Sequence, residues 1–453
     1  MRQMHLVGFL QAQNCTNFAS SWRHPESRSD FLSADFYQEI GRILERGKFD
    51  LGFFDDRLSM PDRYGADHGH TIEHGIRCVK MDPVVVLTVM ANATRCLGLG
   101  ATASTTYFEP FHVARVFQTL DLMSGGRAAW NVVTSLNDGE AANMGRDETM
   151  AHDLRYDRAD EFVEVVLGHW DSWEDDALIV DKASGRFGDG HKVHRLDYRG
   201  QFLKSRGPFT VPRSPQGRPV LIQAGASARG QRFSAQWAEL VFVGWTRIEE
   251  ARHDYAAFRA LVASFGRDPD SVKVTTSCCP IVAVTQAEAE DKAALIASLP
   301  LEVDALSLLS EALNFDFGSK GLDEAFTDAE LAGISGLQAI RDRVVARTGK
   351  KNPTVRDFMV ASGRGRPRMD MVGDPTFVAD RLEEWFTTPA CDGFVIQAPV
   401  CPGSYADFVD LVVPELQRRG LFRRAYTGPT LRDHLGLARA ERGAWKVSRP
   451  AAG

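Results

Sequence analysis

Three polar side chains stand at the ends of apolar runs whose composition is typical of buried strands. Asp56 follows one run, Thr102 ends a second, and Asn131 lies in a third, directly after Trp130. A polar group inside a buried parallel strand needs a hydrogen-bond partner, which could be a ligand or a neighbouring loop carbonyl. Because the carboxyl ends of parallel strands gather at one edge of a sheet, where ligands bind, these residues predict polar contacts to a ligand.

A short turn after a fourth apolar run has the composition of an anion site. It reads Gln-Ala-Gly-Ala-Ser and ends with Ala226 and Ser227. Gly225 lets the backbone approach a ligand closely, and the first amides of the next helix, with the Ser227 hydroxyl, suit a phosphate. Arg229 could add positive charge or point into solvent. The turn therefore predicts a phosphate-binding site.

His152 and Tyr156 form a further pair of candidate ligand contacts. They are four residues apart, where a helix is predicted to start. Side chains at this spacing lie one above the other on the same helix face, so a single ligand could contact both. Together with the strand-end residues and the phosphate turn, the pair would ring one end of the sheet.

Other motifs are weaker. The spacing of His68, His70 and His74 could hold a metal, but they lie in a Gly-rich insertion and we count no cysteine or carboxylate at ligand spacing, so a solvated loop and no metal are predicted. The glycines of residues 98–103 match a dinucleotide fingerprint only formally, because they lie inside a strand. Neither a phosphate-binding Walker motif nor a serine-esterase elbow occurs in the sequence.

The composition is that of an ordinary globular protein. The chain has 453 residues, 44% hydrophobic and 25% charged, with a net charge of -7. This net negative charge does not favour binding to nucleic acid or to an anionic membrane. There is neither a long apolar run nor a secretory layout at the N-terminus, and the seven cysteines form no framework. We therefore expect a cytoplasmic protein with reduced thiols, without nucleic-acid or membrane partners.

The elements that position these residues alternate between strand and helix. Residues 120–135, LDLMSGGRAAWNVVTS, show the unit: a helix that stops at Gly125-Gly126, a tight turn, and a strand. The predicted strands are residues 4–10, 49–54, 97–102, 128–133, 219–223, 240–244, 272–284 and 393–398. The predicted helices are residues 36–46, 83–93, 110–123, 156–170, 227–237, 248–264, 377–386 and 405–419. Such a series predicts an α/β fold, the (β/α)8 barrel.

A barrel of this type needs about 250 residues, so the remaining residues must lie in insertions. Three stretches stand out: residues 57–81, residues 136–217 interrupted by a helix, and residues 285–374. We interpret them as lids that follow strands at the C-terminal face, and the whole chain, residues 1–453, as one domain.

Several long motifs carry a resemblance to a known family. They are LGLGATASTTYFEPFHVAR, LDLMSGGRAAWNVVTSLND, HDLRYDRADEF, PRSPQGRPVLIQAGAS and TLRDHLGL. Over nearly its whole length the chain resembles the bacterial-luciferase-like flavin monooxygenases, and within them the group that acts on nitrilotriacetate, EDTA and dibenzothiophene sulfone. The resemblance implies a (β/α)8 barrel that uses reduced FMN and O2. It also implies a separate NAD(P)H:FMN reductase that supplies the reduced flavin by diffusion.

The resemblance also assigns roles residue by residue. It implies flavin contacts for the strand-end residues, for the pair in HDLRY and for the phosphate turn, namely Asp56, Thr102, Asn131, His152, Tyr156, Ala226 and Ser227. Asn131 and His152 are also the candidate catalytic residues. One departure concerns the substrate side, where some relatives carry histidines: residues 14–21 have none, and none occurs between His253 and His434.

The apolar side chains at the strand ends and in the late insertion suggest the substrate. Phe9, Leu10, Phe54, Phe315 and Phe317 are the candidate pocket residues. They favour a small apolar, aromatic, sulfur- or halogen-bearing compound over a chelator that needs arginine clamps. We expect insertion of one oxygen atom, with oxidation or cleavage of a carbon–heteroatom bond.

Three different functions remain open at this point. They are a monooxygenase of an aminopolycarboxylate chelator, an F420-dependent oxidoreductase, and a flavin-binding protein without catalysis. The expected assembly is a homodimer or homotetramer.

Overall fold

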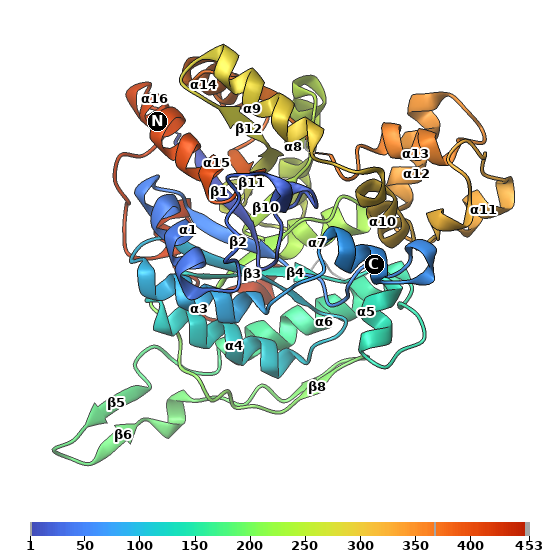
Figure 1. The fold of residues 1–453 in the computed structure, drawn as a ribbon. Helices are drawn as coiled ribbons and strands as arrows, with labels where there is room; N and C mark the ends of the chain where they lie inside the picture. Colours follow the sequence, from blue (N-terminus) through green and yellow to red (C-terminus); the bar gives the residue numbers. More distant parts are fainter. Residues whose placement is uncertain (1, 367, 449–453) are drawn as a thin grey trace.

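Within residues 2–366 and 368–448, which the computed structural model describes, eight parallel strands close into a barrel (Figure 1). The barrel strands are β1 (His5–Gln11), β2 (Leu51–Asp55), β3 (Gly98–Ser104), β4 (Ala128–Val133), β9 (Val220–Gln223), β10 (Leu240–Val243), β11 (Lys273–Cys278) and β14 (Gly393–Ile396). Neighbours in sequence are neighbours in the barrel, and β14 closes it against β1. The predicted (β/α)8 fold is confirmed.

Helices follow each barrel strand and cover its outer face. They are α1 (Ala34–Arg46), α3 (Pro83–Ala93), α4 (Pro110–Met123), α6 (His152–Trp170), α7 (Ala228–Trp237), α8 (Ile248–Ser264), α14 (Pro375–Thr387) and the final segment of α15 (Gly403–Asp407) and α16 (Val413–Arg418). The final helix is not continuous as predicted, because a π-helical turn, Phe408–Val412, separates its halves. Pro414 lacks the N–H that a regular helix needs there, which accounts for the break.

The predicted strand 272–284 is also two elements. β11 ends at Cys278, and β12 (Pro280–Val282) pairs outside the barrel with β13 (Met371–Gly373). Pro280 has no N–H for a further barrel hydrogen bond, so the chain leaves the barrel there.

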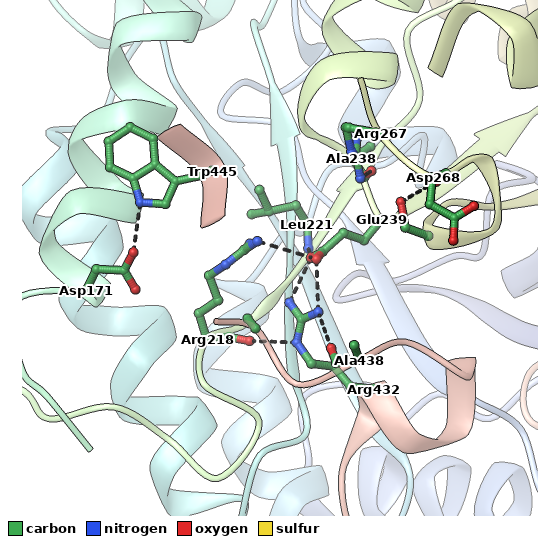
Figure 2. A network of polar contacts seen from close by, with 12 residues as sticks. Asp171, Arg218, Leu221, Ala238, Glu239, Arg267, Asp268, Arg432, Ala438 and Trp445 are labelled. Atoms are coloured by element: carbon green, nitrogen blue, oxygen red, sulfur yellow. Dashed lines mark hydrogen bonds and ion pairs between the residues drawn. The ribbon is translucent and has the colours of Figure 1, made fainter. Parts of the chain in front are cut away.

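The amino end of the barrel is closed by the C-terminal segment. Helix α17 (Leu431–Leu435) packs its leucines against the side chains inside the barrel. Figure 2 shows the polar network beside it, in which Nη1 and Nη2 of Arg432 each donate to the Glu239 carboxylate at 2.9 Å. Burial alone would raise the pKa of Glu239, but Arg218 and Arg432 hold it at about 2. The network is therefore an ion pair that seals this end.

The insertions after β2, β4 and β12 lie at the carboxyl end. Their helices are α2 (Gly69–His74), α5 (Asp138–Asn143), α9 (Gln286–Ser298), α10 (Glu302–Leu313), α11 (Asp328–Gly333), α12 (Gln338–Thr348) and α13 (Val355–Ser362). The last four helices and their loops enclose a small apolar core of their own. We propose that the whole insertion, residues 285–374, forms a lid on a single-domain chain, and we call these residues the lid.

One part of the insertion prediction is wrong. Residues 171–217 follow helix α6 rather than a strand, so they return to the amino end of the barrel. Gln216 confirms this position, since its Nε2 donates to the carbonyl of Ala128 at the start of β4, at 3.0 Å. The stretch holds two hairpins, β5 (Leu178–Asp181) with β6 (Arg186–Gly188) and β7 (Tyr198–Arg199) with β8 (Lys204–Ser205). The first extends away from the barrel and the lid (Figure 1).

No single helix in the described part of the chain is long and apolar enough to cross a membrane, although α9 and α10 pass that test as a pair bent by 70°.

Candidate active site

A chain of hydrogen bonds joins three neighbouring strands at the carboxyl end of the barrel. Asn131 Nδ2 donates to Thr102 Oγ1 at 2.9 Å, and Thr102 Oγ1 donates to the Phe54 carbonyl at 3.0 Å. Thr102 and Asn131 are paired in the register of β3 and β4, so both point into the barrel. Asn131 Oδ1 is buried and has no partner among the described residues. A buried acceptor without a donor is costly, which marks this oxygen as a contact for a ligand N–H or O–H.

Two aspartates end strand β2 with different surroundings. Asp56 accepts one hydrogen bond, from the Arg57 amide at 2.8 Å, and burial raises the pKa of its carboxyl to about 7. Asp55 was missed in the sequence analysis. It accepts from Gln11 Nε2 at 2.7 Å and lies 3.7 Å from Lys80 Nζ. Asp55 shares the inward face with Phe53, but no local pattern distinguishes it from Asp56, because β2 is buried on both faces.

The predicted phosphate turn caps a helix, as expected. Ser227 is the N-cap of α7, and its Oγ accepts from the Gly230 amide at 3.1 Å. His152, the first residue of α6, places its Nε2 3.3 Å from the same hydroxyl. The starts of α6 and α7 therefore meet, and the free amides of α7 form an anion-binding end beside an imidazole.

Glycines keep a cradle open beside this turn. A Cβ atom on Gly230 would lie 2.8 Å from the Tyr156 hydroxyl and 3.1 Å from Gly225 Cα, so a side chain would fill the space. The Tyr156 ring lies 5.2 Å from that of His152, as the spacing of the two residues predicted. Arg229 contributes no free charge to this cradle, because Asp157 and Asp160 pair with it at 3.1 and 2.5 Å.

The lid reaches the strand ends through one carboxylate. Glu311 of α10 accepts from Arg57 Nη1 at 2.9 Å and from Asn137 Nδ2 at 3.3 Å. This contact joins the ends of β2 and β4 to the lid. Its partners are far apart in sequence, and no local pattern could have shown the pairing.

The predicted pocket residues separate into different environments. Phe9 lies in the barrel interior, with its ring 5.7 Å from that of Phe53. Phe54 points to the outer face, where it is fully buried against Tyr37 of α1. Leu10 also lies on that side and lines a cavity between β1 and α1.

Phe315 and Phe317 belong to the core of the lid. Both rings stack on Phe326, at 5.1 and 5.4 Å. As core residues they are not placed to line a pocket over the strand ends. Of the five predicted residues, only Phe9 therefore faces the mouth of the barrel, where its ring contacts Phe53, which in turn contacts Phe242.

This arrangement can be compared with known proteins. Residues 20–390 match the model of a family described as luciferase-like monooxygenase. The chain belongs to the luciferase-like monooxygenase family. It is 44% identical over 448 residues to dibenzothiophene-sulfone monooxygenase of Rhodococcus erythropolis (strain XP), which covers 96% of this chain and 97% of that relative. It is 37% identical over 453 residues to nitrilotriacetate monooxygenase component A of Aminobacter aminovorans, covering 99% of both.

A solved structure is also similar to this chain over nearly its whole length. Riboflavin lyase, crystallised with modified FMN and riboflavin, is 32% identical and superposes with a TM-score of 0.88 over 99% of this chain and 100% of that chain. The resemblance noted in the sequence is confirmed, and this luciferase-like monooxygenase is a flavin-dependent enzyme.

Proposed function

We propose that the chain is the oxygenating component of a two-component monooxygenase that uses reduced FMN and O2. The observation that carries this proposal is the unpartnered Asn131 Oδ1, which lies at the same end of the barrel as the anion-binding start of α7. The first suits the polar edge of a flavin ring, and the second suits a phosphate. The residues present therefore fit FMN.

Different residues would contact the phosphate end and the ring of this cofactor. Ser227, His152 and Tyr156 would hold the phosphate end, while Asn131 and Asp56 would address the ring. Reduced flavin, when bound, supplies the electrons that activate O2 for transfer of one oxygen atom to the substrate. The protein must then orient the substrate and exclude water. We assign the second task to the lid, which Glu311 fastens to the strand ends.

We infer a small apolar, aromatic, sulfur- or halogen-bearing substrate, oxidised or cleaved at a carbon–heteroatom bond. Support comes from Phe9, Phe53 and Phe242 in the barrel interior, where the Phe53 ring lies 5.7 Å from that of Phe9 and meets that of Phe242 edge to face at 4.8 Å. Aromatic rings near the mouth of the barrel offer an apolar floor to such a molecule.

A second candidate substrate, an aminopolycarboxylate chelator, has its own support. Arg364 follows α13; its backbone amide donates to Ser362 Oγ, and its side chain makes no hydrogen bond or ion pair with the described residues. Burial, together with Arg77 and Arg57 nearby, lowers the pKa of Arg364 to about 10. Arginines with spare donors suit a carboxylate. If chelators are the substrates, Arg364→Gln should raise KM for a chelator. KM for an aryl sulfone should not change.

The proposed partner is a separate NAD(P)H:FMN reductase, and the proposed location is the cytoplasm. All seven cysteines lie in the described part of the chain as free thiols, which suits a reducing compartment. The relative from Aminobacter aminovorans is named as a component A. Hydride transfer from a nicotinamide needs a site that stacks it against the flavin, and the sequence offers no dinucleotide turn for it.

Product analysis with a flavin reductase tests the function. The chain is incubated with FMN, NADH and a panel of aryl sulfones, haloarenes and chelators. We expect an oxygenated aryl product only when the reductase is added, also across a dialysis membrane. Proportional NADH oxidation by the chain alone would contradict the two-component proposal. Activity only with F420 would instead indicate a deazaflavin-dependent oxidoreductase, and flavin binding without O2 uptake would indicate a flavin-binding protein without catalysis.

A further inference from the structure

Three metal-ligating side chains lie together on the insertion after β2, outside the residues assigned to the flavin. His70, Glu73 and His74 belong to α2, and their ligand atoms all lie within 4.8 Å of one another. This stretch is a helix, not the solvated loop expected from its glycines. The expectation that no carboxylate stands at ligand spacing is wrong, because helix geometry brings residues three and four apart onto one face and so places Glu73 beside both histidines.

We propose that His70, Glu73 and His74 bind a divalent transition-metal ion of the zinc class. Two imidazoles and one carboxylate form a ligand set that Zn²⁺, Co²⁺ and Ni²⁺ prefer and that Mg²⁺ and Ca²⁺ do not. Ligand atoms about 2.0–2.1 Å from a tetrahedral ion lie roughly 3.3 Å apart. The exposed side chains of His70 and Glu73 can close the remaining distance by rotation. Water would complete the coordination.

The backbone that carries these ligands is already held in place. The His74 carbonyl accepts two hydrogen bonds, from Trp22 Nε1 and from Arg23 Nη2, each at 2.9 Å. Arg23 also binds Asp304 of α10 through two contacts of 2.6 and 2.9 Å. The proposed metal site is therefore fixed to the segment after β1 and to the lid.

Metal binding at this position should stiffen the insertion. A helix of six residues is marginal by itself, because nucleation is costly and few hydrogen bonds follow. An ion held by His70 and His74 would join the second residue of this helix to its last. Binding to the folded state alone also stabilises that state, so the melting temperature should rise with metal concentration.

A neighbouring histidine provides a matched control. His68 is exposed, precedes the helix as its N-cap residue, and places its Nδ1 3.6 Å from Asp67 instead of facing the cluster. It has the same side chain in the same segment but is not a member of the site.

The test uses the full chain without an affinity tag, freed of metal with a chelator and without flavin. Zn²⁺ is titrated by calorimetry, and Co²⁺ by its visible absorption as a report on tetrahedral coordination. We expect one ion per chain, with affinity at least about tenfold weaker in His70→Ala and in His74→Ala. Glu73→Gln should weaken binding less, and His68→Ala should bind like the unmodified chain.

Equal Zn²⁺ affinity in the His70→Ala/His74→Ala double variant would overturn the proposal, as would the absence of saturable binding to the unmodified chain. Thermal melts of the metal-free variants check that they fold. Since flavin takes no part in the titration, the result does not depend on the proposed oxygenase function.

Discussion

Polar atoms left without partners define the site at the scale of single residues. Asn131 Oδ1 is one, and the Tyr156 hydroxyl is another, since it makes no hydrogen bond within the described part of the chain. The fold positions these atoms from different elements, β4 and α6. Keeping the buried Asn131 oxygen unpaired costs stability, and a bound ligand that donates to it recovers this cost.

Removing the Tyr156 hydroxyl should weaken flavin binding. We expect Tyr156→Phe to cost about 0.5–1.5 kcal/mol of FMN binding, the value of one neutral hydrogen bond. Anaerobic titration with reduced FMN measures it. Tyr426→Phe is the control, because that hydroxyl donates to the Phe49 carbonyl at 2.9 Å near the start of β2. The control should lose stability and keep its flavin affinity. If Tyr156→Phe binds FMN as tightly as Tyr426→Phe, Tyr156 does not contact the flavin.

Asp56 should make stability depend on pH. Its pKa is about 7 in the folded chain, raised from 3.8 by burial. The folded state therefore binds more protons in this window, and stability is lost as pH rises from about 4 through 7. Asp56→Asn should raise the melting temperature at pH 8 and change it little at pH 4. Asp62→Asn, at an exposed position, should change neither. A melting temperature that Asp56→Asn leaves unchanged at pH 8 would contradict this account.

Some residue positions could be predicted and others could not, for a physical reason. Thr102, Asn131 and Ser227 carry polar groups at the ends of apolar runs, which is a local signal. Phe54 was placed on the wrong face because barrel strands are buried on both faces, so alternation of polar and apolar residues does not reveal which side points inward. Phe317 was misplaced because a lid core and a pocket wall have the same composition.

At the scale of elements, the predicted phosphate end of the site lies where two helices begin. Ser227 caps α7, and His152 opens α6 beside it. The bounds of α3, α4 and α8 agree with the prediction, since proline starts and glycine or polar stops are local signals. The position of residues 171–217 was not predictable in the same way, because it depends on whether the preceding element is a strand or a helix.

Filling the cradle at the start of α7 should weaken flavin binding without unfolding the chain. In Gly230→Ala the new Cβ would lie 2.8 Å from the Tyr156 hydroxyl and 3.1 Å from Ser227 Oγ. We expect FMN affinity to fall at least about tenfold. The matched substitution is Gly333→Ala in α11, where no atom lies within 4 Å of the new Cβ. It should leave affinity unchanged. If both variants bind FMN like the unmodified chain, the cradle does not hold the phosphate.

At the scale of the whole molecule, the two ends of the barrel differ. Helix α17 and the Glu239 network close the amino end (Figure 2). The lid contacts the carboxyl end through Glu311, which accepts hydrogen bonds from Arg57 and Asn137. We therefore expect ligands to enter from the lid side, and the hairpin at the opposite end to serve another role.

We expect that hairpin to join copies of the chain. It exposes apolar side chains on β5 and β6: Leu178 41%, Ile179 39%, Val180 49% and Phe187 68%. Exposed apolar groups on an extended arm favour contact with a second copy. Phe187→Glu should shift the chain toward monomer in size-exclusion chromatography with light scattering. Met123→Glu, at an exposed apolar position on α4, should not. A monomeric unmodified chain, or a Phe187→Glu oligomer of unchanged size, would contradict this role.

The central claim is that flavin binds at the carboxyl end of the barrel with its phosphate on the start of α7. A crystal structure of the chain with FMN tests it most directly. The predicted result is a phosphate within hydrogen-bond distance of Ser227 Oγ and the Tyr156 hydroxyl, with Asn131 facing the ring. A phosphate bound after β14, beside α15, is the usual location in barrels of this type and would contradict the claim.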